Sequence, residues 1–134
     1  YPADHPWSQP PSGPVDPRNL DGLDERFRPK VVRILQRLQQ KGWQPRVASG
    51  RRTLAQQREK VRKGYSKTLR SWHLLGRAAD IVDRRWGWNG PAANLDHPFW
   101  KDLGEAARLE GLTWGGNWKR FRDVAHVQDD DRRR

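Results

Sequence analysis

The sequence contains no cysteine and no apolar stretch that approaches the length of a membrane-spanning helix. Without cysteine the chain can form neither a disulfide framework nor a thiolate zinc site, so any bound metal must be held by His, Asp or Glu. A helix needs about 20 consecutive apolar residues to cross a bilayer, and their absence predicts that the chain does not insert into a membrane. The 134 residues fit one domain that is large enough to bury a core.

Acidic residues are few relative to basic ones. The chain has 16 Asp and Glu against 27 Lys and Arg, which gives a formal net charge of +11. Such an excess attracts polyanions by long-range electrostatic steering. Two classes of partner meet this condition: nucleic acid, and anionic polymers of the bacterial envelope such as teichoic acids or lipopolysaccharide. The charge alone does not distinguish them.

Prolines and charge runs divide the chain into three parts. Six of the ten prolines lie in the first 19 residues, which show no apolar periodicity. Residues 1–22 are therefore predicted to form an extended arm that wraps on the domain or trails from it. Residues 23–128 are predicted to form the domain, and residues 129–134 a charged tail exposed to solvent.

Helical and strand patterns alternate within the domain. Apolar residues recur at helical spacing from position 24 to 41, where Gly42 follows as a stop signal. Thr53 is placed to cap the next helix. The predicted elements are helices over 24–41, 54–63 and 98–110 and strands over 46–49, 78–83 and 124–128. This order predicts a small α+β domain with a mostly antiparallel sheet flanked by helices.

Two short segments carry residues that are typical of a metal centre. His73 lies just before the strand that contains Asp80, and His126 lies in the last predicted strand. Two imidazoles and one carboxylate leave a tetrahedral zinc ion with one open position, which is typical of a catalytic site. Asp123, in a turn that ends near Val124, suits a general base that moves a proton from water to a leaving amine. The pattern predicts a hydrolase.

These residues resemble a known family. Ser71-x-His73-x6-Asp80 with Asp123-x2-His126 is similar to the zinc peptidases of the D-alanyl-D-alanine carboxypeptidase type. That family shares a fold with lysostaphin-like enzymes and the hedgehog signalling domain. The resemblance covers roughly residues 23–128.

Two further segments carry the same resemblance. Ser49-Gly50-Arg51-Arg52-Thr53, followed by Gln57, resembles the family's upstream segment. Gly115-Gly116-Asn117-Trp118-Lys119 resembles the lead-in of its L-alanyl-D-glutamate endopeptidase branch. The combination of spaced segments is specific, whereas each segment alone would be weak.

The resemblance implies roles for particular residues. One Zn²⁺ would be held by His73, Asp80 and His126, with Asp123 as the base. Arg52 would bind a substrate carboxylate and stabilise the developing oxyanion, although it also lies within a basic helix face that could simply be solvated. The expected substrate contacts are Ser71, Gln57, Trp114 and Trp118. For the two tryptophans, packing in the core is the alternative.

The implied activity is zinc-dependent hydrolysis of the peptidoglycan stem peptide, at the bond between L-Ala and D-Glu. Its partners would be peptidoglycan and, through the basic surface, anionic envelope polymers, and the protein would be a monomer. The setting would be outside the cytoplasm, as a secreted bacteriolytic or periplasmic enzyme or as a phage endolysin. The first residue is Tyr rather than Met, which favours a processed, secreted form.

Three other functions compete with this interpretation. A D-Ala-D-Ala carboxypeptidase of the same fold would use the same chemistry on a terminal residue. A non-catalytic zinc-containing module would bind the wall or a polyanion, but it would have no need of a proton shuttle at Asp123. A nucleic-acid binder is indicated only by the charge and the tryptophans, and its binding would depend on salt and not on chelators. Nucleic acid is therefore not the expected partner.

Overall fold

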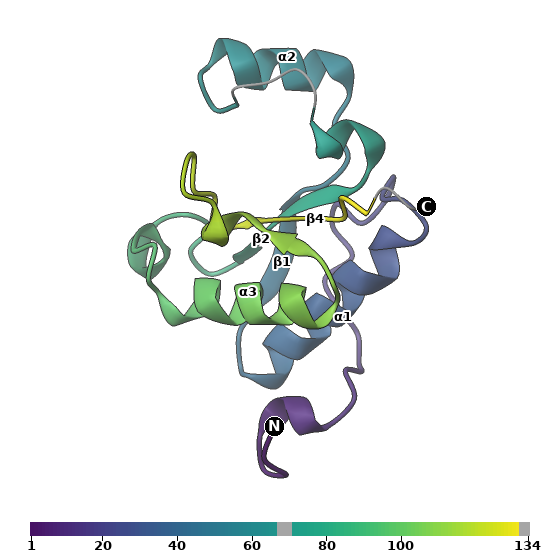
Figure 1. Ribbon diagram of the computed structural model, residues 1–134, viewed down its shortest axis with the longest axis vertical. Helices are drawn as coiled ribbons and strands as arrows, with labels where there is room; N and C mark the ends of the chain where they lie inside the picture. The colour runs from purple at the N-terminus through teal and green to yellow at the C-terminus, as the bar shows by residue number, and fades with distance from the viewer. Residues whose placement is uncertain (67–70, 132–134) are drawn as a thin grey trace.

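The computed structural model describes residues 1–66 and 71–131, so the end of the predicted tail, residues 132–134, lies outside the described residues. At its centre is a four-stranded antiparallel sheet in the order β1-β2-β4-β3 (Figure 1). Its strands are β1 (Pro45–Ser49), β2 (Ala78–Asp83), β3 (Thr113–Trp114) and β4 (His126–Gln128). The predicted α+β class and antiparallel sheet are confirmed. The two-residue β3 is too short for its alternation to be recognised in the sequence.

Two helices cover one face of the sheet, and a third lies apart from them (Figure 1). The covering helices are α1 (Phe27–Gln40) and α3 (Pro98–Leu109), which also pack against each other. The third helix, α2 (Leu54–Arg62), lies beyond the opposite face. Short 3-10 helices occupy Pro6–Ser8, Trp72–Leu75, Gly90–Ala93 and Gly115–Asn117. No helix in the described part of the chain is both long enough and apolar enough to cross a membrane.

Helix α1 supplies much of the core because its apolar residues share one face. All five are fully buried: Phe27, Val31, Ile34, Leu35 and Leu38. The helix begins at Phe27 rather than at the predicted position 24, because the Asp24 carboxylate accepts hydrogen bonds from the N–H groups of Arg26 and Phe27. Trp100 and Leu103 of α3 complete the layer against the sheet.

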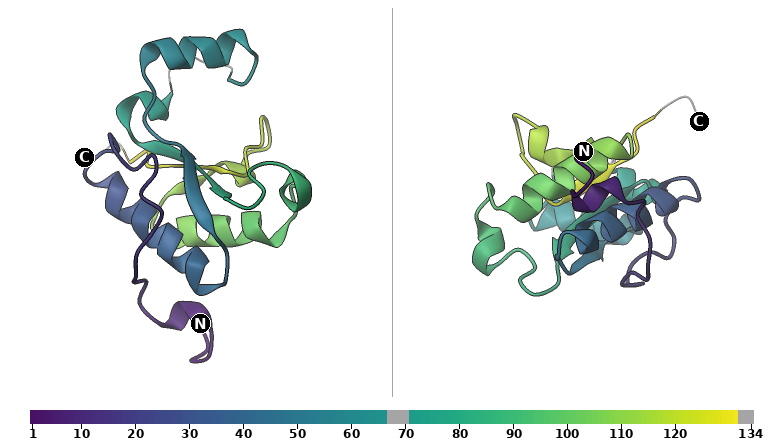
Figure 2. Two further views of the ribbon diagram at one scale, coloured as in Figure 1. Left: turned by 180° about the vertical axis from the view of Figure 1, so that it is seen from behind. Right: turned by 90° about the horizontal axis from the view of Figure 1, so that it is seen from below.

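The N-terminal arm packs along α1 instead of trailing from the domain (Figure 2). Trp7 is buried, and its Nε1 donates a hydrogen bond to the Arg37 carbonyl at 2.7 Å. The side chains of Gln36 and Gln39 donate to the carbonyls of Gly13 and Pro14. Glutamines on the outer face of α1 thus satisfy backbone carbonyls of a proline-rich segment that is mostly outside helices and strands.

The predicted exposure of the tail is wrong for its first residue. Asp129 is buried, and its N–H donates to the Arg77 carbonyl at 2.9 Å. Its carboxylate lies 3.7 Å from Arg77 and 4.0 Å from Lys30. A run of charges is normally solvated, but Asp129 directly continues β4 and meets two cations from other elements.

Candidate metal centre

The site is built on a row of residues that runs across the sheet. Asp80 in β2 pairs in register with His126 in β4 on one side and with Ser49 in β1 on the other. Directly opposed residues on neighbouring antiparallel strands project to the same face. The neighbours Ala79 and Ile81 project to the other face, where they join the core. The strand register therefore brings His126 beside Asp80, although 46 residues separate them.

His73 enters this row from the short helix that precedes β2. The Ser71 hydroxyl accepts a hydrogen bond from the His73 N–H at 3.1 Å and so caps the turn. The turn ends at Gly76, where φ is +68° and a Cβ atom would lie 2.5 Å from the Gly22 carbonyl. Only glycine fits such a position. The turn directs the imidazole of His73 onto Asp80, with Nε2 at 3.5 Å from Oδ2.

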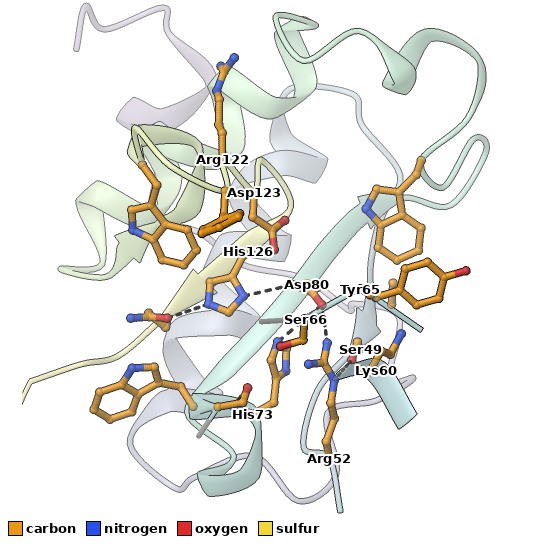
Figure 3. A pocket seen from close by; sticks show the side chains of 18 residues that line it. Ser49, Arg52, Lys60, Tyr65, Ser66, His73, Asp80, Arg122, Asp123 and His126 are labelled. Atoms are coloured by element: carbon orange, nitrogen blue, oxygen red, sulfur yellow. Dashed lines mark hydrogen bonds and ion pairs between the residues drawn. The ribbon is translucent and has the colours of Figure 1, made fainter. Parts of the chain in front are cut away.

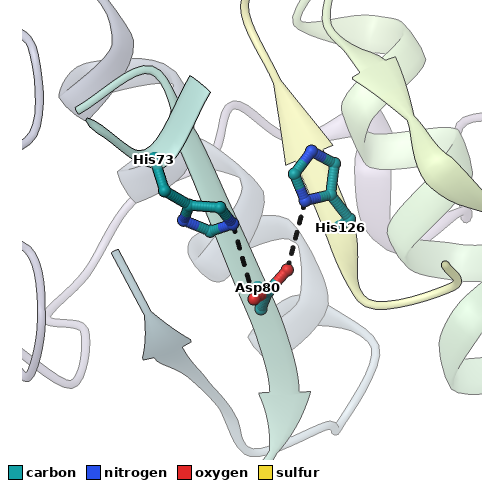
Figure 4. Close-up of side chains that lie close together, drawn as sticks. All are labelled: His73, Asp80 and His126. Atoms are coloured by element: carbon teal, nitrogen blue, oxygen red, sulfur yellow. Dashed lines mark hydrogen bonds and ion pairs between the residues drawn. The ribbon is translucent and has the colours of Figure 1, made fainter. Parts of the chain in front are cut away.

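One donor atom from each of His73, Asp80 and His126 lies within 4.8 Å of the others (Figure 4). His73 Nδ1 is 2.7 Å from the Gly50 carbonyl, which can only accept, so this nitrogen carries the proton and Nε2 presents a lone pair. His126 Nε2 is 2.7 Å from Gln128 Oε1, which by the same logic leaves Nδ1 to face Asp80 at 3.3 Å. Two imidazole lone pairs and a carboxylate thus converge, and this donor set fits a zinc ion.

The pKa values of the cluster residues also indicate that a positive charge at its centre is favourable. Burial alone would raise the pKa of Asp80, but hydrogen bonds with His126 and His73 more than offset it and hold that pKa below its ordinary value. Burial would lower the pKa of His126, whereas the hydrogen bond and charge of Asp80 raise it above its ordinary value. A proton or a metal ion between this carboxylate and the two imidazoles would add to the positive charge that Arg52 supplies to Asp80.

Asp123 lies above this cluster in the loop that leads to β4 (Figure 3). Its N–H donates to the Gly115 carbonyl at 3.0 Å, and its own carbonyl accepts from His126 N–H at 3.3 Å. A Cβ at Gly115 would lie 2.4 Å from the Asp123 carbonyl, so glycine is required there. Desolvation in the cleft and the negative charge of Asp80 raise the pKa of Asp123. The turn over residues 124–125 frees Asp123 from strand alternation, as predicted.

Arg52 is held in place by three side-chain contacts. Its Nε donates to the Ser49 hydroxyl at 3.2 Å, and Nη1 donates to Gln57 Oε1 at 3.0 Å. Its Nη2 donates to Asp80 Oδ2 at 3.1 Å. A guanidinium has five N–H groups, so two remain for a substrate. Arg52 therefore orients Asp80 in addition to facing the cleft.

The structure separates the four residues that the sequence predicts as substrate contacts. Ser71 and Trp118 line the cleft around the cluster. Gln57 lies behind Arg52, where it is fully buried and donates to the Ser66 hydroxyl at 2.9 Å. Trp114 lies outside the cleft, with its Nε1 bonded to the Val124 carbonyl and its ring against Gly104. Trp114 is partly buried and packs against the core, which is the alternative stated above for the two tryptophans.

The cleft that contains the cluster has a volume of about 1080 Å³. Several residues that the sequence analysis did not single out line it: Lys60, Tyr65, Ser66, Trp88, Phe121 and Arg122. Lys60 is one of several basic residues of α2, and its spacing does not distinguish it from the others. The other residues of this set come from loops, where spacing does not predict direction.

A small antiparallel sheet that presents two histidines and an aspartate in an open cleft, with a further carboxylate above them, is typical of a single-metal hydrolase. The profile of the peptidase M15 family, described as D-alanyl-D-alanine carboxypeptidase, matches residues 64–129. This match includes the His73, Asp80, Asp123 and His126 positions. Arg52 lies upstream of it.

Comparison with curated proteins finds two relatives that are L-alanyl-D-glutamate peptidases by name. The chain is 29% identical over 113 residues to the L-alanyl-D-glutamate peptidase of Listeria phage A118, which covers 82% of this chain and 39% of that protein. It is 26% identical over 130 residues to the peptidoglycan L-alanyl-D-glutamate endopeptidase CwlK of Bacillus subtilis strain 168, over 86% and 71% of the two chains. The chain thus spans well under half of the phage protein.

The solved structures with a similar fold include two peptidases. One is the L-Ala D-Glu endopeptidase ChiX of Serratia marcescens, at 35% identity and a TM-score of 0.56, over 82% of each chain. The other is the D,D-pentapeptidase VanY from a VanB-type resistance cassette, solved with Zn(II), at 21% identity and a TM-score of 0.58, over 87% of this chain and 82% of that one. The likeness to VanY concerns the fold alone. The chain belongs to the D-alanyl-D-alanine carboxypeptidase family of peptidases.

Proposed function

We propose that this protein is a zinc-dependent peptidoglycan peptidase that hydrolyses the stem peptide between L-Ala and D-Glu. The observation that carries the proposal is the convergence of His73, Asp80 and His126 in an open cleft, with the Asp123 carboxylate above them. The names of the phage peptidase, CwlK and ChiX support this choice of bond. His73, Asp80 and His126 would hold one Zn²⁺, which supplies a Lewis acid that polarises the scissile carbonyl.

The protein's own groups move the protons in this reaction. Asp123 accepts a proton from the attacking water as the oxygen bonds to the L-Ala carbonyl carbon. When the C–N bond breaks, Asp123 returns the proton to the nitrogen of D-Glu, which leaves as a free amine. The products are a carboxylate on L-Ala and a new amino terminus on D-Glu. The two remaining N–H groups of Arg52 stabilise the oxyanion, and Ser71 and Trp118 contact the substrate from the cleft wall.

The proposed setting is the cell wall outside the cytoplasmic membrane. One curated relative comes from a phage and another from a bacterium. The two settings to compare are therefore lysis by a phage enzyme and wall cleavage by a secreted bacterial enzyme. The comparison adds the protein to intact cells whose envelopes carry teichoic acids and to intact cells whose envelopes carry lipopolysaccharide. We also propose that the protein acts as a monomer, and that its net charge of +11 concentrates it on anionic envelope polymers.

The test is mass spectrometry of fragments released from purified peptidoglycan. Release of fragments with a new amino terminus on D-Glu, abolished by a chelator and restored by added zinc, is the expected result. Loss of a single terminal D-Ala would instead identify a carboxypeptidase, an activity within the range of the family. No release from several wall types by the zinc-loaded protein would contradict the proposal and favour a binding module.

A further inference from the structure

Among the residues that the structure describes, three cationic side chains other than histidine line the cleft, and two of them already bond to other groups of the protein, with two N–H groups of Arg52 left for the oxyanion. Arg52 is bonded to Asp80, Ser49 and Gln57. Arg122 points away from the cluster (Figure 3), donates to the carbonyls of Gly116 and Leu95 and lies 3.6 Å from Asp96. The third is Lys60, for which the described residues provide no carboxylate within salt-bridge distance.

The fold of the chain around Lys60 places this residue at the cleft wall. It lies in the last turn of α2 and is half-buried. The chain folds back over this turn, because the N–H groups of Tyr65 and Ser66 both donate to the Lys60 carbonyl, at 2.9 and 3.2 Å. The Lys60 ammonium lies over the Tyr65 ring, with Nζ 5.5 Å from the ring centroid. The ring contact favours a position of the ammonium at the cleft wall, where it can bind an anion.

The charged groups at the cluster are already engaged with one another. Asp80 and Asp123 both place negative charge in the cleft, and the guanidinium of Arg52 is already bonded to Asp80. In the proposed function these groups and the zinc ion are engaged at the reacting carbonyl, so a carboxylate elsewhere on the substrate is best paired by a cation on the cleft wall. Figure 3 shows Lys60 and Tyr65 together on one side of Asp80, with His126 on the other side.

We propose that Lys60 binds the free α-carboxylate of the substrate's D-Glu residue and is a specificity-determining residue. The inference rests on the proposed function, in which the nitrogen of D-Glu is the leaving group. D-Glu continues the stem peptide through its γ-carboxyl, so its α-carboxyl, next to the scissile nitrogen, is either a free carboxylate or an amide. Only the carboxylate forms a charge-assisted hydrogen bond with an ammonium group.

The test compares two synthetic muramyl stem peptides that differ only in an α-carboxylate or an α-carboxamide on D-Glu. Wild-type protein should have the higher kcat/KM on the carboxylate. Lys60→Met, which keeps the length of the side chain and removes its charge, should reduce this preference by about 10- to 100-fold. Lys60→Arg should restore most of the preference, because it restores the cation.

Lys63→Met is the matched control. Lys63 follows Lys60 by three residues, is exposed and lies 3.6 Å from Glu59, outside the cleft. The Lys63→Met substitution removes the same formal charge from the same end of α2. The variant should therefore keep the wild-type preference for the carboxylate peptide. An active Lys60→Met protein that discriminates between the two peptides as the wild type does would overturn the proposal.

A binding measurement separates this inference from the proposed function. Calorimetric titration of both peptides into zinc-loaded Asp123→Asn protein, with and without Lys60→Met, gives the same ratio without cleavage. If wild-type protein cleaves neither peptide, the proposed function fails, and the inference about Lys60 is still decided by this ratio. The inference is supported if Asp123→Asn protein binds the carboxylate peptide more tightly than the carboxamide peptide and if this difference disappears with Lys60→Met. Equal affinities of the two peptides for the protein that retains Lys60 refute the inference.

Discussion

His73 and His126 each commit one ring nitrogen to a hydrogen bond with an uncharged oxygen of the protein. The Gly50 carbonyl and the Gln128 side chain select the tautomers in which the other nitrogen faces Asp80. Gln128 is in turn oriented by the Asp130 carboxylate, to which its Nε2 donates at 3.3 Å. The residues around the cluster therefore determine the orientation of its donor atoms without a bound metal.

Asp123→Asn should separate metal binding from catalysis. Asparagine keeps the size of the side chain but cannot accept the proton from water, so the rate should fall by on the order of 10²- to 10⁴-fold. Zinc content after dialysis should not change, because Asp123 is not among the three converging ligands. Stem-peptide cleavage at the wild-type rate by the zinc-loaded variant would show that Asp123 is not the base.

Asp83 is a buried carboxylate with a structural function at the end of β2. Its oxygens accept hydrogen bonds from the N–H of Gln44 at 3.0 Å, the N–H of Arg85 at 3.0 Å and the Arg85 guanidinium at 2.7 and 2.9 Å. Burial by itself would raise the pKa of Asp83, but these bonds outweigh it and hold the pKa below its ordinary value. The ionised form is therefore favoured in the folded protein.

Asp83→Asn should destabilise the protein in a pH-dependent way. A depressed folded pKa contributes stability above the unfolded pKa, near 3.9, and this stability is lost as the pH falls toward the folded value. The variant should be less stable by on the order of 1–3 kcal/mol at pH 7, and the difference should shrink below about pH 4. Urea unfolding of both proteins from pH 3 to pH 7 measures this. A difference that stays constant with pH would contradict the assignment.

At the scale of elements, α2 is attached to the domain by a polar contact. Gln57 is the buried residue of this helix, and none of the apolar side chains of α2 is buried. Gln57 accepts from Arg52 and donates to Ser66, so it connects α2 to the cluster through Arg52 and Asp80. The orientation of α2, which carries Lys60 at the cleft, therefore depends on hydrogen bonds and not on core packing.

Gln57→Ala should impair catalysis more than stability. Loss of its bonds lets Arg52 reorient, and kcat should fall by about 10- to 100-fold. The free energy of unfolding should fall by about 1–3 kcal/mol, because the variant leaves a small cavity and removes the partner of Arg52 and Ser66. Gln56→Ala is the control, since Gln56 caps the start of α2 through the Thr53 N–H and does not touch Arg52. If both variants lose kcat equally, the loss reflects helix stability and not the position of Arg52.

At the scale of the whole molecule, the charge of +11 is spread over a domain whose candidate site lies in an open cleft of about 1080 Å³. Exposed basic residues lie within α2 and near both of its ends, and further basic residues lie in the loop before Asp123. This surface should steer the protein to an anionic wall before the cleft engages a stem peptide.

Binding to purified walls should consequently depend on salt and on wall polymers. Raising NaCl from about 50 to about 500 mM should weaken binding to walls that carry teichoic acids, because the Debye length falls from about 14 Å to about 4 Å. Walls stripped of teichoic acids should bind more weakly and with less dependence on salt. A co-sedimentation assay measures both, and salt-independent binding would contradict a role for the net charge.

The sequence by itself indicated the three longer helices, the strands other than β3 and the residues of the candidate centre. Regular apolar spacing identified α1, and the spacing of His73, Asp80, Asp123 and His126 identified the candidate ligands and base, because both patterns are local properties of the chain. Thr53 was recognised as a cap for the same reason, and its side chain accepts from the Gln56 N–H.

Only the tertiary structure decided which of the remaining residues belong to the cleft. It placed Gln57 behind Arg52, Trp114 outside the cleft and Lys60 within it, and it buried Asp129 against Arg77 and Lys30. These outcomes depend on strand register and on the path of loops between distant segments. Local spacing carries no information about either, because the direction of a side chain is set by what packs around it.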